Sequence, residues 1–181
     1  MLPVITIARQ FGSGGHEVGE KVAKKLGLPF FDKELIAMAA KKSGLSEEVF
    51  ADADEKATSS LLYSMVMGSY AFGARVPSIN EMPINDKLFI IQSDIIKKAA
   101  AEGPCVIIGR CADYILREHE NCLNVFVHAD KAARIKRIVG LNYCEEKKAP
   151  DFVTKKDKQR ANYYNFYSNN RWDDLLNYDL T

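Results

Sequence analysis

The sequence has no marked excess of basic residues, no paired cysteines at metal-binding spacing and no long apolar run. Its 25 lysines and arginines face 24 acidic residues, which argues against a dedicated nucleic-acid binder. The four cysteines form no C-x-x-C pair, so a zinc site is poorly supported. No stretch reaches the ~18 apolar residues of a membrane span, and no secretory signal is visible. We therefore expect a cytoplasmic protein with free thiols that binds neither membrane nor nucleic acid.

The chain does contain an alternation of short β-branched runs and helical segments. With 181 residues and 47% hydrophobic content, it is expected to form a single domain over residues 1–181. Strands are predicted at VITIA (Val4–Ala8), PFFD, CVIIG, LNVFVHA and, as a fifth strand that has barely begun, YDLT. Because strands alternate with helices, the pattern predicts an α/β fold with a mostly parallel sheet.

Helices are predicted between these strands. One runs from the first glycine cluster to Leu26 and stops at Gly27, and an amphipathic helix runs from about residue 86 to residue 102. RCADYILREHE and DKAARIKRIVG are also predicted to be helical. The last helix is predicted to open at Thr154, which stands three residues before Asp157 as in a capping box. Residues 45–83 have the pattern of two helical pieces followed by a loop rich in helix breakers.

A glycine cluster follows the first strand, in the stretch ARQFGSGGHEVG. The dinucleotide fingerprint G-x-G-x-x-G starts at Gly12 and Gly14 but requires glycine or alanine where Glu17 stands. The phosphate-loop string G-x-x-x-x-G-K-[ST] also fails, because Arg9 takes its first glycine position and Gly15 its lysine position. Neither string therefore assigns the loop by itself.

The physical properties of the cluster still favour phosphate binding. Backbone N–H groups of a glycine-rich turn can form one concave nest for an anion, here from Gly12, Ser13, Gly14 and Gly15. The helix that begins there adds unpaired N–H groups and partial positive charge. Arg9 and His16 flank the cluster and could supply the side-chain charge of the missing lysine. The alternative is a simple tight turn that joins strand to helix.

Two further candidates stand at the carboxyl ends of predicted strands, where open parallel sheets bind ligands. Arg110 follows CVIIG, and its planar guanidinium could grip a phosphate; the alternative is a surface salt bridge. Asp32 follows the short second strand and could hold a metal ion through water, or could cap the next helix. The sequence leaves both alternatives open, and it predicts no set of direct metal ligands.

A basic segment follows the fourth strand. Arg134 and Arg137 lie three residues apart on one predicted helix face, and a charged loop with a proline leads on to Arg160. Such a helix and loop suit a lid over about residues 140–160 that closes on phosphates. We interpret the three arginines as functional, and we interpret as a solvated face the lysines Lys147, Lys148, Lys155, Lys156 and Lys158.

Five stretches together resemble the cytidylate kinase-like family, a branch of the P-loop nucleoside monophosphate kinases. They are VITIARQFGSGGHEVGEKVAKKLGLPFFDKELI, VIIGRCADYIL, VFVHADKAARIKRI, DKQRANYY and YDL. The resemblance implies a three-layer α/β fold: a five-stranded parallel sheet flanked by helices, a helical acceptor-binding insert at about residues 45–85, and a lid. It also implies transfer of the γ-phosphoryl group of ATP to a nucleoside monophosphate with Mg²⁺, and it allows a homodimer paired through the inserted helices.

The resemblance also implies a role for each candidate residue. Gly12 to His16 would cradle the ATP phosphates, Asp32 would face the acceptor nucleotide, and Arg110 would contact the acceptor phosphate. The lid side of the site would consist of Arg134, Arg137, Asp157 and Arg160.

The glycine loop departs from that of true cytidylate kinases, which read G-K-[GST]-[ST] where this chain has Gly14, Gly15, His16 and Glu17. The lysine that spans the β and γ phosphates and the hydroxyl that coordinates Mg²⁺ are both absent, a change typical of the cytidylate kinase-like branch. The acceptor pattern S-G-x-x-[YF]-R is replaced by KELIAM, so cytosine selectivity does not carry over. Two functions stay open: an ATP-dependent kinase for a nucleoside monophosphate or related small metabolite, and a nucleotide-sensing module that binds without turnover.

Overall fold

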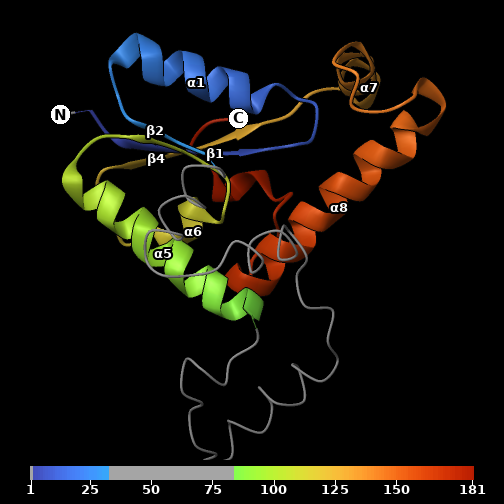
Figure 1. The fold of residues 1–181 in the computed structure, drawn as a ribbon. Helices are drawn as coiled ribbons and strands as arrows, with labels where there is room; N and C mark the ends of the chain where they lie inside the picture. The colour runs from blue at the N-terminus through green and yellow to red at the C-terminus, as the bar shows by residue number, and fades with distance from the viewer. Residues whose placement is uncertain (1, 33–83) are drawn as a thin grey trace, which may run out of the picture.

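The centre of the fold is a parallel sheet of four strands in the order β2-β3-β1-β4 (Figure 1). The computed structural model describes residues 2–32 and 84–181. The strands are β1 (Val4–Arg9), β2 (Phe30–Phe31), β3 (Val106–Ile108) and β4 (Cys122–Val127). β1 pairs in parallel with β3 on one side and with β4 on the other, so the predicted parallel α/β sheet is confirmed.

The predicted fifth strand is wrong in its extent. YDLT contributes one isolated parallel bridge between Val125 and Leu180, closed by a bond of 2.8 Å from the N–H of Phe126 to the carbonyl of Leu180. The N–H groups of Asp179 and Leu180 both donate to the carbonyl of Asn124, so the segment meets β4 at one point and does not extend into a ladder. The segment occupies the place of a strand beside β4 without forming one.

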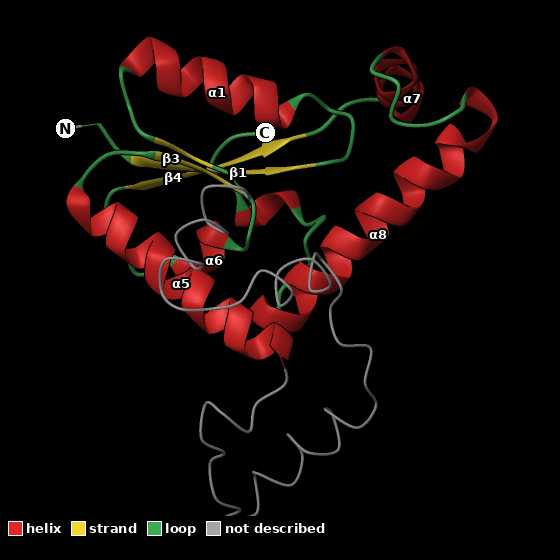
Figure 2. Cartoon of the chain, viewed as in Figure 1, coloured by secondary structure: helices red, strands yellow, loops and turns green. Residues whose placement is uncertain are grey.

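Helices cover both faces of the sheet, which gives three layers (Figures 1 and 2). α1 (Gly15–Leu26) lies on one face. The other face carries α5 (Ile84–Glu102) and α6 (Ala112–Ile115). Beyond β4 come α7 (Lys131–Gly140), the short helix η2 (Glu146–Lys148) and α8 (Ala149–Ser168), which runs from α7 to the α5 side of the sheet. A last short helix, η3 (Leu175–Asn177), precedes the C-terminal bridge.

The two layers of the core follow from the alternation of side chains along the strands. Ile5 and Ile7 of β1 point to the α1 face and pack in one buried cluster with Ala23. Val4 and Ala8 point to the opposite face and belong to the larger cluster that includes residues of α5, α6 and α8. Because both faces are covered, the strands contain apolar residues on both sides, as is usual in parallel sheets.

Three helix boundaries test the sequence predictions. α1 ends as predicted at Gly27, which has a φ of 66° in the left-handed region that glycine favours. The helix predicted over RCADYILREHE is wrong beyond Ile115, because the chain tightens into turns there, with the N–H of Arg117 bonded to the carbonyl of Tyr114, before it enters β4.

The predicted start of the last helix at Thr154 is also wrong. α8 begins at Ala149, directly after η2, with Pro150 in its first turn, where a missing N–H costs little. The hydroxyl of Thr154 donates to the carbonyl of Pro150 at 2.8 Å instead of capping a helix. The segment predicted as a lid, residues 140–160, therefore comprises the end of α7, a loop, η2 and the first half of α8. Its closure stays a prediction.

Some predictions fall where the structure makes no statement. The acceptor-binding insert at about residues 45–85, and with it the expected homodimer contact, lies almost wholly outside the described residues. Within residues 2–32 and 84–181, no helix is both long and apolar enough to cross a membrane. All four cysteines are free thiols, as predicted.

Candidate phosphate-binding site

The glycine cluster forms the turn from β1 into α1, at the carboxyl edge of the sheet. Gly12 and Gly14 have φ angles of 79° and 87°, a conformation that other residues adopt only with strain. A Cβ on Gly12 would lie 2.9 Å from the carbonyl oxygen of Arg134, so the turn also packs too closely on α7 for a side chain. Gly14 is the N-cap of α1, and the first N–H groups of a helix have no intrahelical partner. The turn can therefore offer backbone donors to an anion.

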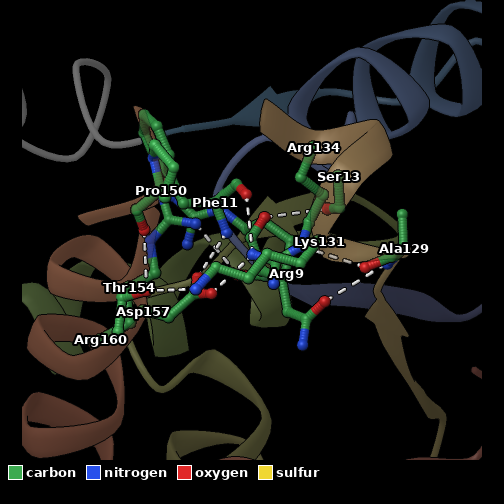
Figure 3. Close-up of polar contacts among 11 residues, drawn as sticks. Arg9, Phe11, Ser13, Ala129, Lys131, Arg134, Pro150, Thr154, Asp157 and Arg160 are labelled. Carbon is green, nitrogen blue, oxygen red and sulfur yellow. Dashed lines mark hydrogen bonds and ion pairs between the residues drawn. The ribbon is translucent and has the colours of Figure 1, made fainter. Parts of the chain in front are cut away.

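A buried ion pair braces this turn from the side of α7 and α8 (Figure 3). The carboxylate of Asp157 accepts a bond of 2.7 Å from the backbone N–H of Phe11 and one of 2.6 Å from Arg134. The same guanidinium donates to the carbonyl oxygens of Phe11, at 3.1 Å, and Ala129, at 3.0 Å. The Arg134 side chain is only 8% exposed. The structure thus places Arg134 and Asp157 behind the loop, bonded to protein groups; the catalytic role predicted for Arg134 stays a prediction.

Arg160 lies in α8, about one helical turn after Asp157, and it also contacts the glycine turn. It donates to the carbonyl of Arg9 at 3.0 Å, and its guanidinium lies 5.3 Å from the centre of the Phe11 ring. The Ser13 hydroxyl donates to the carbonyl of Gln10 at 2.9 Å, which closes the turn locally. These bonds hold the backbone in place from several elements, so the turn is preorganised.

A cleft of about 550 Å³ opens over this turn. Most of the predicted site residues line it: Arg9, Gly12, Gly14, Gly15, His16, Asp32, Arg137 and Arg160. His16 and Asp32 meet at 3.2 Å on the side of β2. On the other side the lining continues to Leu141 and Tyr143 beyond α7. The cleft therefore brings the glycine loop together with cationic side chains, whereas Ser13, Arg110, Arg134 and Asp157 lie outside its lining.

Arg137 lies directly over the glycine turn. A Cβ on Gly14 would stand 3.3 Å from its guanidinium carbon, and the guanidinium forms an ion pair with Glu17 in the first turn of α1. Lys21 also binds Glu17, at 2.6 Å. Bonds from Lys21 and from Arg137 hold the pKa of Glu17 below its usual value. An anion that enters the nest would compete with this carboxylate for Arg137.

A second turn, after β3, places Arg110 against a smaller cavity. Gly109, Arg110 and Cys111 have consecutive φ angles of 68°, 57° and 56°. The cavity has a volume of about 40 Å³, and the cations among the described residues that line it are Arg9, Arg110 and Arg160. Arg9 and Arg160 line both cavities. The two predicted subsites, for the donor phosphates and for the acceptor phosphate, are thus neighbours.

Asp113 lies behind this second turn, and sequence reasoning missed it. The side chain is buried, and it accepts a bond of 2.6 Å from the hydroxyl of Tyr164. Burial raises the pKa of Asp113, and burial together with the neighbouring Asp113 raises the pKa of Tyr164. Its position three residues after Arg110 is the one signal that the sequence offered. Among residues 2–32 and 84–181, no group of three or more histidine, cysteine or acidic side chains is placed to hold a metal ion.

Comparisons with known proteins identify the family and the fold of this chain. A family model described as the cytidylate kinase-like family matches residues 4–181. The crystal structure of an uncharacterized protein from Eubacterium ventriosum ATCC 27560 is 29% identical, with a TM-score of 0.71 over 98% of this chain and 85% of that one. Shikimate kinase from Bacteroides thetaiotaomicron is 15% identical, with a TM-score of 0.53 over 99% and 85% of the two chains, and this likeness shows the shared fold. A comparison with curated proteins found no match.

The family match over residues 4–181 covers both turns at the carboxyl edge, after β1 and after β3, and the contacts from α7 and α8. A parallel sheet with helices on both faces is the arrangement that the resemblance implied, although the sheet has four strands instead of five. Because the matched region spans nearly the whole sequence, the chain belongs to the cytidylate kinase-like family.

Proposed function

We propose that this protein transfers the γ-phosphoryl group of ATP to a nucleoside monophosphate or a related small metabolite. The observation that carries the proposal is the cleft of about 550 Å³ over the glycine turn, lined by Arg9, His16 and Arg137. Phosphoryl transfer needs positioning and charge neutralisation more than a nucleophilic side chain. Membership of a kinase-like family supports the same class of reaction.

The donor phosphates fit the glycine turn. Gly12 and Gly14 have positive φ angles, and a Cβ at either position would lie against residues of α7. The first turn of α1 supplies N–H groups and the positive end of the helix dipole. Arg137 then adds a charge from above the turn once the anion displaces Glu17. In this arrangement Arg134 and Asp157 position the turn, since their bonds go to Phe11 and to each other.

Mg²⁺ would fit the same cleft if most of its ligands were phosphate oxygens and water. Two carboxylates, Glu17 and Asp32, line the cleft, and Mg²⁺ commonly takes one or two carboxylates together with phosphate oxygens and water. When bound, the ion supplies charge neutralisation at the phosphates. The protein's own part is to bring those carboxylates and the glycine turn to the same space.

The acceptor phosphate is proposed to lie against Arg110. The small cavity beside this residue opens near the large cleft, and Arg9 and Arg160 border both. Asp32, at the end of β2, lines the large cleft next to His16 and is proposed to face the rest of the acceptor. Convergent guanidinium groups suit an acceptor that carries a phosphate.

A second candidate is a module that binds a nucleotide without turnover. The ion pair of Glu17 and Arg137 favours this second function, because the carboxylate already binds the guanidinium that a phosphate would otherwise bind. The missing lysine and hydroxyl of the loop are consistent with the same alternative.

One experiment separates the two functions. The protein is incubated with ATP, Mg²⁺ and a panel of nucleoside monophosphates and small hydroxylated metabolites, and ADP release is measured beside ATP binding by calorimetry. A kinase shows acceptor-dependent ADP release that falls at least about 100-fold in Arg110→Ala. A sensor binds ATP with no release on any acceptor. Absence of binding to ATP and to ADP contradicts both functions.

A further inference from the structure

The space beside Gly15 is already filled by another residue. Gly15 stands at the lysine position of the phosphate-loop string. A Cβ built on Gly15 would lie 2.5 Å from the Cβ of Arg9, 2.9 Å from its Cγ and 3.3 Å from the Cβ of Val127. Distances of this size cannot be accommodated without movement of the backbone or the arginine stem. Arg9 and a side chain at position 15 are therefore mutually exclusive.

The charged end of Arg9 lies between the two cavities. Arg9 is the last residue of β1, and its guanidinium packs against Gly109, in the turn after β3, where a Cβ would collide with it. Its stem thus runs past the glycine turn and its head reaches the turn that carries Arg110. Arg9 lines the cleft of about 550 Å³ and also the cavity of about 40 Å³. A group that passes from the donor subsite to the acceptor subsite would pass this guanidinium.

We propose that Arg9 takes over the role of the missing loop lysine, with its charge supplied from the end of β1 instead of from the start of α1. The proposal rests on the proposed phosphoryl transfer. Arg9 binds the γ-phosphoryl group and stays protonated throughout. The bond from the γ-phosphorus to the β–γ bridging oxygen breaks with its electron pair left on ADP, and an oxygen of the acceptor donates the pair of the new bond. A proton on that oxygen, if there is one, leaves to water.

The other cations near the turn are less suited to this role. His16 lies on the β2 side beside Asp32 and Arg137 lies at the outer side of the turn beside Glu17, and neither lines the small cavity. Of the described cations that line the large cleft, Arg9 and Arg160 also line the small one. Arg160 donates to the carbonyl of Arg9, so it holds the end of β1 in place as well.

The test moves the charge from one position to the other. Arg9→Gly removes the arginine stem and its Cβ, and Arg9→Gly/Gly15→Lys returns a cation at the position of the usual lysine. We measure acceptor-dependent kcat, and separately the ratio of ATP to ADP affinity by calorimetry, which needs no turnover. Arg9→Lys keeps a charge without the planar fork, and Arg171→Gly is the control because Arg171 pairs with Asp173 on the exposed surface.

Arg9→Gly is expected to lower kcat about 100-fold and to lower the preference for ATP over ADP about tenfold, as for one charged hydrogen bond. The double variant is expected to recover at least tenfold in kcat, whereas Gly15→Lys alone is expected to lose stability through the clash. Arg171→Gly is expected to change neither ratio.

The proposal is overturned if folded Arg9→Gly keeps the wild-type ratio of ATP to ADP affinity. It is also overturned if the double variant is folded, by its thermal transition, but recovers neither kcat nor the affinity ratio. Should Arg9→Gly fold poorly, Arg9→Gln decides, because it keeps much of the stem and removes the charge: a loss of the preference for ATP over ADP supports the proposal, and an unchanged preference overturns it. If the wild type binds both nucleotides but releases no ADP, the kinase function fails while the affinity ratio still tests Arg9.

Discussion

The turns after β1 and β3 lie side by side at the carboxyl edge of the sheet, and they use left-handed backbone in different ways. After β1, the positive φ angles fall on Gly12 and Gly14, which bear no side chain. After β3, they fall on Gly109 and then on Arg110 and Cys111, two residues for which this conformation costs about 1 kcal/mol or more each.

The difference indicates what each turn presents. A turn made of glycines brings main-chain N–H groups close to a ligand, so the backbone itself is the binding group. The strained turn at Arg110 places a long side chain in the lining of the small cavity, and this side chain is the group that we propose to contact the acceptor phosphate. The second turn can hold its strained backbone because Cys111 and Asp113 are buried against α8.

Gly14→Val is expected to have the largest effect. Valine strongly disfavours a φ of 87°, and its Cβ would approach the Arg137 guanidinium at 3.3 Å. ATP affinity should fall by about 100-fold or more, as for two charge-assisted hydrogen bonds of about 1.5 kcal/mol each. Calorimetric titration with ATP measures it. Gly140→Val is the control, because nothing lies within 4 Å of a Cβ there. Wild-type affinity in Gly14→Val would contradict the backbone nest.

Arg134→Met tests the brace behind the first turn. The variant leaves the Asp157 carboxylate without its buried partner at 2.6 Å, so the free energy of unfolding should fall by about 3 kcal/mol. Urea unfolding followed by circular dichroism measures the change. Arg171→Met removes an exposed pair with Asp173 and should change stability by less than about 0.5 kcal/mol. If both variants lose the same amount, the buried pair does not hold the turn.

Arg110→Gly tests the second turn. Glycine adopts a φ of 57° without strain, so we expect the free energy of unfolding to stay level or to rise by up to about 1 kcal/mol. Acceptor-dependent turnover should fall nevertheless, because the side chain that the strained turn presents is gone. Arg117→Gly, outside the left-handed positions, should be less stable than the wild type. A clear loss of stability in Arg110→Gly would mean that the contacts of the arginine side chain outweigh the cost of its left-handed backbone.

The sequence was sufficient to predict the architecture because its signals are local. Alternating β-branched runs and helical periods predicted the parallel α/β sheet, and Gly27 predicted the end of α1. The fifth strand and the start of α8 were wrong for different reasons. YDLT has the composition of a strand but meets β4 in a single bridge, and Thr154 has the spacing of a cap although η2 already leads into a helix at Ala149.

Many of the residues that line the cleft were predictable from the sequence, whereas the contacts among the candidate residues were not. Glycine clustering and strand ends identified Arg9, Gly14 and Arg110 as candidates. No pattern in the sequence indicates that Arg134 faces Asp157 and the carbonyl of Phe11, since these contacts join residues more than twenty positions apart. The exclusion between Arg9 and a side chain at position 15 likewise appears only in three dimensions.

Asp113→Asn gives the smallest expected effect and probes the support beneath the second turn. Burial raises the pKa of Asp113 in the folded protein, so the folded state holds this proton more tightly than the unfolded chain, where the pKa is about 3.9. The stabilisation from protonation is present below that value and is lost as the pH rises through the raised pKa. Asparagine cannot ionise, and its amide oxygen can still accept the bond from Tyr164.

Between pH 4 and pH 7 the stability of Asp113→Asn should therefore rise relative to the wild type, as measured by urea unfolding at each pH. Asp173→Asn is the matched control with the opposite sign, because the bond from Arg171 lowers the pKa of Asp173 and its stabilisation is lost as the pH falls through that lowered value. If the two variants showed the same pH dependence of stability, the carboxyl group of Asp113 would not be desolvated in the folded protein. The strain at Arg110 would then need support from elsewhere in α6 and α8.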